Sequence, residues 1–183
     1  AMDEYFNIDK KYIGIDSETK DYILRDLSKS NSRFIITKNY LKLLENENIE
    51  LFTCNEQNFV FDSYGLCKKT NNDFISDKFL HEQYLLIKEN NKKVLFSGCS
   101  HKGILNLQSA FNPDYIFGGF HFMKLDVNIF EERKKLLNAA EQLSTTHTKY
   151  FTCHCTGQEQ FRFLKSLLPD NLEYCSCGSK FEI

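Results

Sequence analysis

The sequence contains no run of apolar residues close to the roughly 18 to 20 that a helix needs to cross a bilayer. Its first residues, Ala-Met-Asp-Glu, have none of the pattern of a secretory signal peptide. Positive charge is not in excess either, because 23 Lys and Arg stand against 25 Asp and Glu and the formal net charge is -2. We therefore expect a cytoplasmic protein with no membrane partner and without the basic surface that binding to nucleic acid requires.

The chain also lacks an internal repeat, a low-complexity segment and a long linker. Its seven cysteines are an odd number, and without an export signal they argue against a disulfide framework. We expect reduced thiols. A length of 183 residues with 42% hydrophobic residues is enough to bury a core. The simplest interpretation is one domain that spans residues 1–183.

The first half of the chain has one helical pattern and several short β-rich runs. Apolar residues recur at helical spacing over residues 16–30, behind Asp16 and Ser17 as possible N-caps. The runs at 33–37, 50–54 and 59–62 have the composition of strands.

A hairpin is the most clearly marked unit and covers residues 83–97. The apolar runs 84–87 and 94–96 flank Glu89-Asn90-Asn91-Lys92. Asparagine tolerates the left-handed conformation that a tight hairpin turn requires. The second strand of this hairpin should end at Gly98.

Helices and strands alternate after the hairpin, which is typical of an α/β fold. The sequences Asn128-Ile129-Phe130-Glu131 and Thr156-Gly157-Gln158-Glu159 each have the spacing of a helix capping box. The expected elements are helices at 102–111, 128–143 and 156–168 and strands at 115–117, 150–153 and 173–175.

Three of the expected strand ends carry a histidine: His101, His121 and His154. Ligands in α/β folds usually bind at the carboxyl ends of strands. Cys99 and His101 follow the strand 94–96 and are competent zinc ligands. Alternatively, this loop is a plain strand-to-helix turn, in which Ser100 caps the helix and His101 is merely exposed.

The other two loops allow alternatives as well. Side chains alternate along an extended strand, so Cys153 and Cys155 should share one face and His154 the other. Both cysteines could instead be small buried apolar residues. The two glycines before His121 permit a close backbone approach, and a lone histidine there could be structural.

Three runs of the sequence resemble, in their order, a branch of the metallo-β-lactamase superfamily. They are Phe96-Ser97-Gly98-Cys99-Ser100-His101-Lys102-Gly103-Ile104, Gly118-Gly119-Phe120-His121 and Phe151-Thr152-Cys153-His154-Cys155-Thr156-Gly157. This branch contains an archaeal dihydropterin-aminobenzene phosphate synthase. Glu82-Gln83 and Lys11-Tyr12-Ile13-Gly14 are weaker matches to the same branch. The resemblance covers most of the chain and is best from about His81 onward.

The resemblance implies an α/β fold, the C-terminal part of an αββα sandwich, with a mixed sheet and flanking helices. It also implies two zinc ions, which supply a bound hydroxide that attacks an ester or phosphoester. His101 and His154 match metal-binding positions, and Cys99 would be a bridging or neighbouring ligand. His121 and Ser100 would contact substrate or support the ligands.

One part of the family pattern is absent. The first motif of the superfamily has two histidines separated by one residue and then an Asp-His pair, and the five histidines here form no such pair. We therefore expect the C-terminal portion of a hydrolase of small molecules, with an incomplete zinc site and no activity by itself. We also expect a homodimer that covers the apolar face left by the absent half.

Two other interpretations remain open. Cys153, Cys155, Cys175 and Cys177 could together hold a structural zinc, although Cys-x-Cys pairs are tighter than the usual zinc-ribbon spacing. The chain could also be a metal-free interaction domain that reuses the fold.

Overall fold

A mixed seven-stranded sheet forms the centre of the molecule. The computed structural model describes residues 4–7, 9–37, 39–43, 47–55, 58–59, 66–71 and 73–183. Within these residues the sheet has the strand order β10-β9-β8-β7-β6-β3-β2. Its strands are β2 (Tyr40–Lys42), β3 (Ile49–Thr53), β6 (Gln83–Glu89), β7 (Lys92–Phe96), β8 (Tyr115–Phe117), β9 (Lys149–Thr152) and β10 (Leu172–Tyr174).

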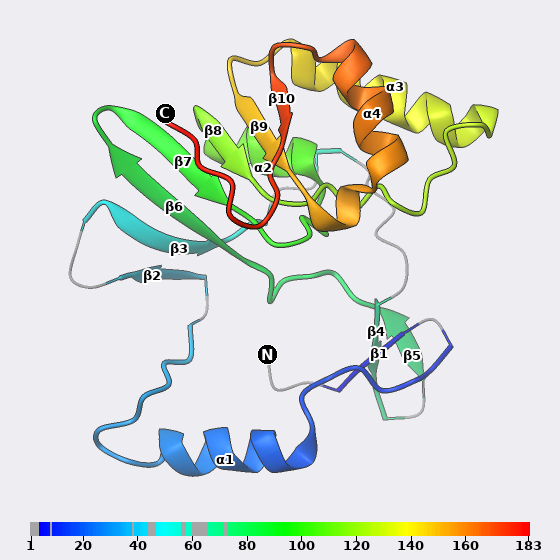
Figure 1. Ribbon diagram of the computed structural model, residues 1–183. Coiled ribbons are helices and arrows are strands. Elements are labelled where there is room, and N and C mark those ends of the chain that lie inside the picture. The colour runs from blue at the N-terminus through cyan, green and yellow to red at the C-terminus, as the bar shows by residue number, and fades with distance from the viewer. Residues whose placement is uncertain are drawn as a thin grey trace.

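The sheet changes from antiparallel to parallel at β7. Strands β2, β3, β6 and β7 pair antiparallel, and β7, β8, β9 and β10 pair parallel. The parallel strands are connected through α2 (Ile104–Phe111), α3 (Phe130–Ser144) and α4 (Gln158–Leu167), which pack together on one face of the sheet (Figure 1). None of the described helices is both long and apolar enough to cross a membrane. The predicted α/β class with a mixed sheet and flanking helices is confirmed.

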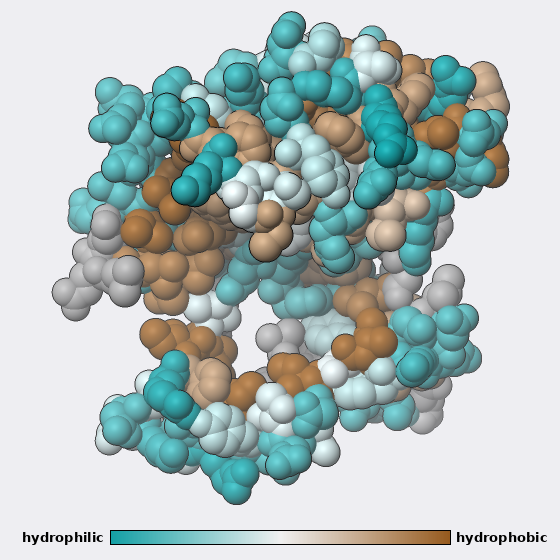
Figure 2. Space-filling view, in the orientation of Figure 1, coloured by the Kyte–Doolittle hydropathy of each residue, from teal (hydrophilic) through white to brown (hydrophobic). Residues whose placement is uncertain are grey.

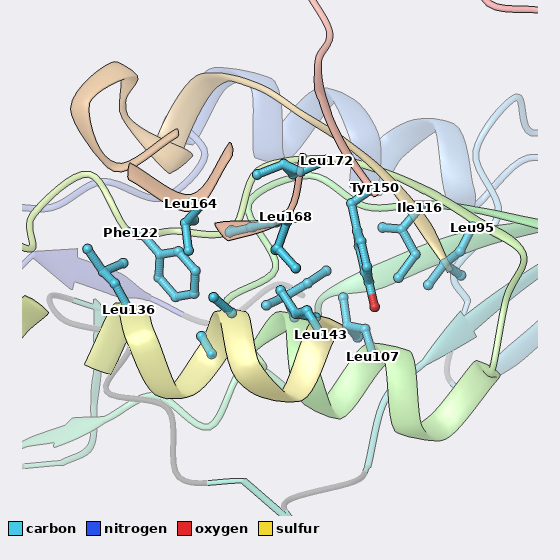
Figure 3. Packing of buried hydrophobic residues seen from close by; sticks show 14 of the residues in the cluster. Leu95, Leu107, Ile116, Phe122, Leu136, Leu143, Tyr150, Leu164, Leu168 and Leu172 are labelled. Carbon is cyan, nitrogen blue, oxygen red and sulfur yellow. The ribbon is translucent and has the colours of Figure 1, made fainter. Parts of the chain in front are cut away.

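The hydrophobic core lies between these helices and the sheet (Figure 3). One residue from each of five neighbouring strands forms a continuous row under the helices, because the register places them side by side. These residues are Leu86, Leu95, Ile116, Tyr150 and Leu172. The one polar atom of the row is also satisfied, since the Tyr150 hydroxyl lies 2.7 Å from that of Thr146.

Local sequence patterns predicted two of the elements accurately. Helix α1 (Ser17–Leu27) begins at Asp16, whose carboxylate accepts a hydrogen bond of 2.9 Å from the Thr19 amide. The hairpin of β6 and β7 turns at Asn90 and Asn91, whose φ angles of 49° and 61° are both left-handed. Both elements are confirmed, although β7 ends at Phe96 and not at the predicted Gly98.

The strand predicted over 33–37 is wrong. These residues are outside regular secondary structure, and the reason lies next to them. The Asp26 carboxylate accepts a hydrogen bond of 2.8 Å from the Arg33 amide and one of 3.2 Å from the Ser32 hydroxyl. These bonds fix the chain in a turn. Of the strand predicted over 59–62, residues 60–62 lie outside the described residues.

A three-stranded sheet, not predicted, lies beside α1 and apart from the main sheet (Figure 1). It consists of β1 (Tyr5–Asn7), β4 (Leu66–Lys69) and β5 (Phe74–Ser76). Short strands of three or four residues give little alternation to detect, which explains why the sequence did not reveal them.

The two predicted capping boxes are also wrong. Helix α4 begins after Gly157, with no side-chain cap, and α3 begins after Ile129. The Thr156 hydroxyl instead accepts a hydrogen bond of 2.8 Å from the Phe120 amide. A tertiary contact therefore uses the group that the local pattern assigned to the helix.

The sheet face opposite the helices carries a second row of apolar residues, which we call the apolar row. It consists of Leu51, Leu85, Phe96, Phe117 and Phe151, placed side by side by the strand register. The Phe117 and Phe151 rings stack with centroids 4.4 Å apart, and Phe181 of the C-terminal segment packs on Phe151. Phe96 is 37% exposed. In Figure 2, apolar surface is visible over β3 and β6.

We propose that the chain forms a homodimer through the apolar row, because Phe96 is exposed there and its neighbours Leu85 and Phe117 are only half-buried. Burial there stabilises by roughly 25 cal/mol per Å². Phe96→Lys should convert the dimer to a monomer, as measured by light scattering on a dilution series. The control Leu137→Lys changes a 41% exposed leucine of α3 on the helical side and should leave the dimer intact. A compact monomer of the unmodified chain at low micromolar concentration would contradict the proposal.

Candidate metal centre

The candidate site lies where the parallel strands β7, β8 and β9 end. Hydrogen bonds continue past these ends and tie the three loops together. The Ser97 amide donates to the Phe117 carbonyl (2.8 Å), the Gly118 amide to the Phe151 carbonyl (3.0 Å), and the Gly119 amide to the Gly98 carbonyl (2.8 Å). The side chains that follow are therefore held close together by backbone bonds.

Three potential metal ligands converge at this edge: Cys99, His121 and Cys155. Their ligand atoms all lie within 4.8 Å of one another. Cys155 is buried, and Cys99 and His121 are half-buried. In a tetrahedral zinc site with Zn–S bonds of about 2.3 Å, two sulfur atoms lie about 3.8 Å apart, so the ligand atoms would need to approach by about 1 Å. The arrangement therefore fits a zinc-sized ion.

Left-handed residues turn each of the three loops. Ser100, His121 and His154 have φ angles of 53°, 58° and 47°, which are uncommon for residues other than glycine. His121 illustrates the effect, because the flanking Phe120 and Phe122 are both buried in the core while its own imidazole lies beside the two thiols. Such backbone conformations concentrate at functional sites.

Gly119 leaves room for Cys155. A Cβ atom added at Gly119 would collide with the Cys155 Sγ atom. The two consecutive glycines were predicted to permit a close backbone approach, and at Gly119 this prediction is confirmed.

Glu82 fixes His101 at the border of the cluster. Its Oε1 atom accepts a hydrogen bond of 3.0 Å from the His101 amide and lies 3.0 Å from His101 Nδ1. The other oxygen, Oε2, accepts from the Lys102 amide (3.1 Å) and from the Tyr84 hydroxyl. A carboxylate at Nδ1 keeps the proton on that atom and leaves the Nε2 lone pair available to a cation.

Two aromatic rings set the position of the His101 imidazole. The Phe79 ring stacks on it with centroids 4.5 Å apart and an angle of 6° between the planes. The His121 ring also lies at a centroid distance of 4.5 Å from it. His101 is therefore a neighbour of the Cys99, His121 and Cys155 cluster, and its side chain is only 28% exposed.

Burial and hydrogen bonding act in opposite directions on the Glu82 carboxyl. Burial raises its pKa, but hydrogen bonds from His101 and Tyr84 lower the pKa by more, so that it lies below its usual range. The carboxylate is thus ionised at neutral pH. Burial, with a smaller contribution from Cys99, raises the pKa of the Cys155 thiol to about 12.

The structure places the other predicted site residues as follows. Ser100 is buried with its hydroxyl 2.7 Å from that of Ser97, and α2 has Gly103 at its N-cap. The alternative in which Ser100 caps the helix and His101 is merely exposed is therefore wrong. His154 is exposed at the start of a short 3₁₀ turn, outside the cluster. Its role as a ligand stays a prediction.

Cys155 was missed as a candidate ligand of this cluster. Its burial agrees with the expectation of a small apolar residue, and only the fold reveals that it approaches Cys99. The available signal was that each of three strand-end loops carries a cysteine or histidine.

The alternative zinc site of Cys153, Cys155, Cys175 and Cys177 finds no support. All four cysteines belong to the described part of the chain, yet no three of their sulfur atoms converge as closely as the ligands of the Cys99, His121 and Cys155 cluster. Cys177 is exposed.

A separate hollow of about 750 Å³ lies between α1 and the segment before β6, and it is lined by Ile35, Ile36 and Leu80 among others.

Replacing Glu82 by Ala should destabilise the fold, because it leaves the Tyr84 hydroxyl and two backbone amides without their acceptor. We expect a loss of about 2 to 3 kcal/mol in the free energy of unfolding, measured by urea denaturation. Glu47→Ala is the control, since the side chain of Glu47 is 86% exposed in its ion pair with Lys42. Its removal should cost less than about 0.5 kcal/mol. Equal effects of the two substitutions would contradict this view of Glu82.

Comparison with known proteins gives several matches. No family model matches the sequence. An uncharacterised protein of Methanocaldococcus jannaschii is 24% identical over 183 residues, which cover 97% of this chain and 62% of that protein. The 7,8-dihydropterin-6-methyl-4-(β-D-ribofuranosyl)-aminobenzene-5'-phosphate synthase of the same organism is 27% identical over 167 residues, which cover 84% of this chain and 54% of the synthase.

A solved structure supports the same relationship. The crystal structure of a metal-dependent hydrolase of the β-lactamase superfamily superimposes with a TM-score of 0.73 at 22% identity, over 99% of this chain and 67% of that one. The chain spans only 54% to 62% of the length of the two sequence relatives. The resemblance predicted from the three motifs is therefore confirmed, and the chain has the fold of the metallo-β-lactamase superfamily.

Proposed function

We propose that this chain is part of a zinc-dependent hydrolase that acts on ester or phosphoester bonds, and that it is inactive by itself. One observation carries the proposal: the ends of β7, β8 and β9 bring Cys99, His121 and Cys155 together, beside His101. Convergence of this kind at the carboxyl edge of parallel strands is where α/β enzymes bind ligands. The fold match to a metal-dependent hydrolase supports the same reaction class.

The residues of the site have separate tasks in this proposal. A bound zinc ion would lower the pKa of a water ligand to about 7 and polarise the ester or phosphoryl oxygen. Cys99, His121 and Cys155 can hold such an ion. Glu82 keeps the His101 Nε2 lone pair free for a cation, and the resemblance assigns His101 and His154 to the ligands. Ser100 lies next to the site, where it supports the loop through Ser97.

Among the described residues, only one group of three potential ligand atoms lies as close together as Cys99, His121 and Cys155. A catalytic zinc ion usually has three protein ligands and a water molecule, so a binuclear site needs about twice that number. The two remaining histidines lie elsewhere: His81 is next to Asp77 and His147 is next to Asp114. We infer that further ligands come from residues beyond these 183, in keeping with the greater length of the relatives.

The substrate class is a small molecule. The name of the matched synthase contains a 5'-phosphate, which favours phosphorylated compounds over peptides or nucleic acids. The net charge of -2 does not favour a nucleic-acid partner.

A zinc-binding module without catalysis is the second candidate. It is favoured by the two cysteines in the cluster, because thiolate-rich zinc sites are more often structural than catalytic.

The zinc-loaded chain should hydrolyse no member of a panel of phosphoesters and thioesters above the rate of buffer. In a longer relative with both halves, alanine at the position that matches His101 or His154 should lower activity by at least about 100-fold without unfolding, because each removes a metal ligand. Serine at the match to Cys175 is the control and should retain activity. Chelator-sensitive hydrolysis by the 183-residue chain alone would overturn the proposal of inactivity.

A further inference from the structure

We propose that Cys99, His121 and Cys155 by themselves bind one thiophilic divalent cation of the zinc class, through two thiolates and one imidazole. This inference deepens the proposed function and rests on it for the class of metal. The site itself follows from residues of this chain, so it requires no ligand from elsewhere.

The geometry favours binding without a large rearrangement. The three ligand atoms already lie within 4.8 Å of one another, and each follows a strand of the same parallel ladder. The loops that carry them are tied by backbone hydrogen bonds, among them Gly119 to Gly98 and Met123 to Cys155. A site held by such bonds loses little conformational entropy when the metal enters.

The chemistry of the donors selects the ion. Two thiolates and one imidazole suit zinc, cobalt and cadmium, whereas magnesium and calcium require oxygen ligands. The nearby carboxylate of Glu82 is already engaged by two backbone amides, the Tyr84 hydroxyl and His101. Binding of the ion would release the thiol protons, and the two thiolates would then balance the charge of one divalent cation in this half-buried place.

Three protein ligands would leave a fourth coordination position on a tetrahedral ion, and the His101 ring borders the cluster. The His101 ring lies 4.5 Å from that of His121, and its Nδ1 atom is held by Glu82. A site with three protein ligands and one open position is the arrangement of catalytic zinc. The three ligands suffice for binding in this chain, and His101, which the resemblance assigns to the ligands, borders the fourth position.

Titration of the reduced full chain with Co²⁺ tests the proposal. We expect one ion per chain, a near-ultraviolet thiolate-to-cobalt charge-transfer band, and displacement of cobalt by zinc. Cys99→Ser and Cys155→Ser should each halve the band and weaken binding by more than about 100-fold, beyond the roughly 10- to 100-fold loss typical of an outer partner. His121→Ala should weaken binding similarly. At saturating Co²⁺, however, its band should keep the intensity expected for two thiolates.

Two matched variants serve as controls. Cys67→Ser and Cys175→Ser each remove a half-buried cysteine outside the proposed site and should change nothing. Circular dichroism verifies folding, and Cys99→Ser decides the matter if the buried Cys155→Ser variant does not fold.

Several outcomes would overturn the site. These are a band that persists in full in Cys99→Ser and Cys155→Ser, a band lost in Cys175→Ser, or binding that requires His101 but neither cysteine. The proposed function fails separately, since it depends on hydrolysis by a longer relative. If a longer relative hydrolyses its substrate in a metal-dependent reaction but its cobalt form shows no thiolate band, only the site proposed here is rejected.

Discussion

The parallel pairing of β7, β8 and β9 is the constraint on which the site depends. Parallel strands end at the same edge, and here the ladder continues into the loops through bonds such as Gly119 to Gly98. Loops tied so closely must reverse direction within a few residues, and Ser100, His121 and His154 do so with left-handed backbone. The ladder therefore decides which side chains meet, while the helices stabilise it from one face only.

The sequence predicted features that depend on neighbouring residues. Asn90 and Asn91 define the hairpin because a two-residue turn is decided by its own two residues. The sequence also located the three strand-end histidines correctly. It did not show which side chain of each loop faces the cluster. Cys155 is buried and His154 exposed in a loop whose Thr156 hydroxyl accepts a hydrogen bond from the Phe120 amide, 36 residues away. A contact between distant segments leaves no periodic signal in the sequence.

The molecule has a well-packed core on one face of the sheet, a partly exposed apolar face on the other, and a candidate metal site at the sheet edge. The row under the helices, from Leu86 to Leu172, is buried and well packed. On the opposite face, Phe96 remains exposed in the apolar row. At the edge between the two faces, the described residues bring together one group of potential metal ligands, Cys99, His121 and Cys155. The two sequence relatives are longer, and this chain spans 54% to 62% of their length.

X-ray diffraction at the zinc absorption edge, on crystals of the zinc-saturated chain, tests the central claim most directly, because the anomalous difference map locates the metal independently of activity. The account predicts one peak per chain, bonded to the Sγ atoms of Cys99 and Cys155 and to the His121 imidazole. A peak bonded instead to Cys153, Cys175 and Cys177, or no peak near the ends of β7, β8 and β9, would contradict it.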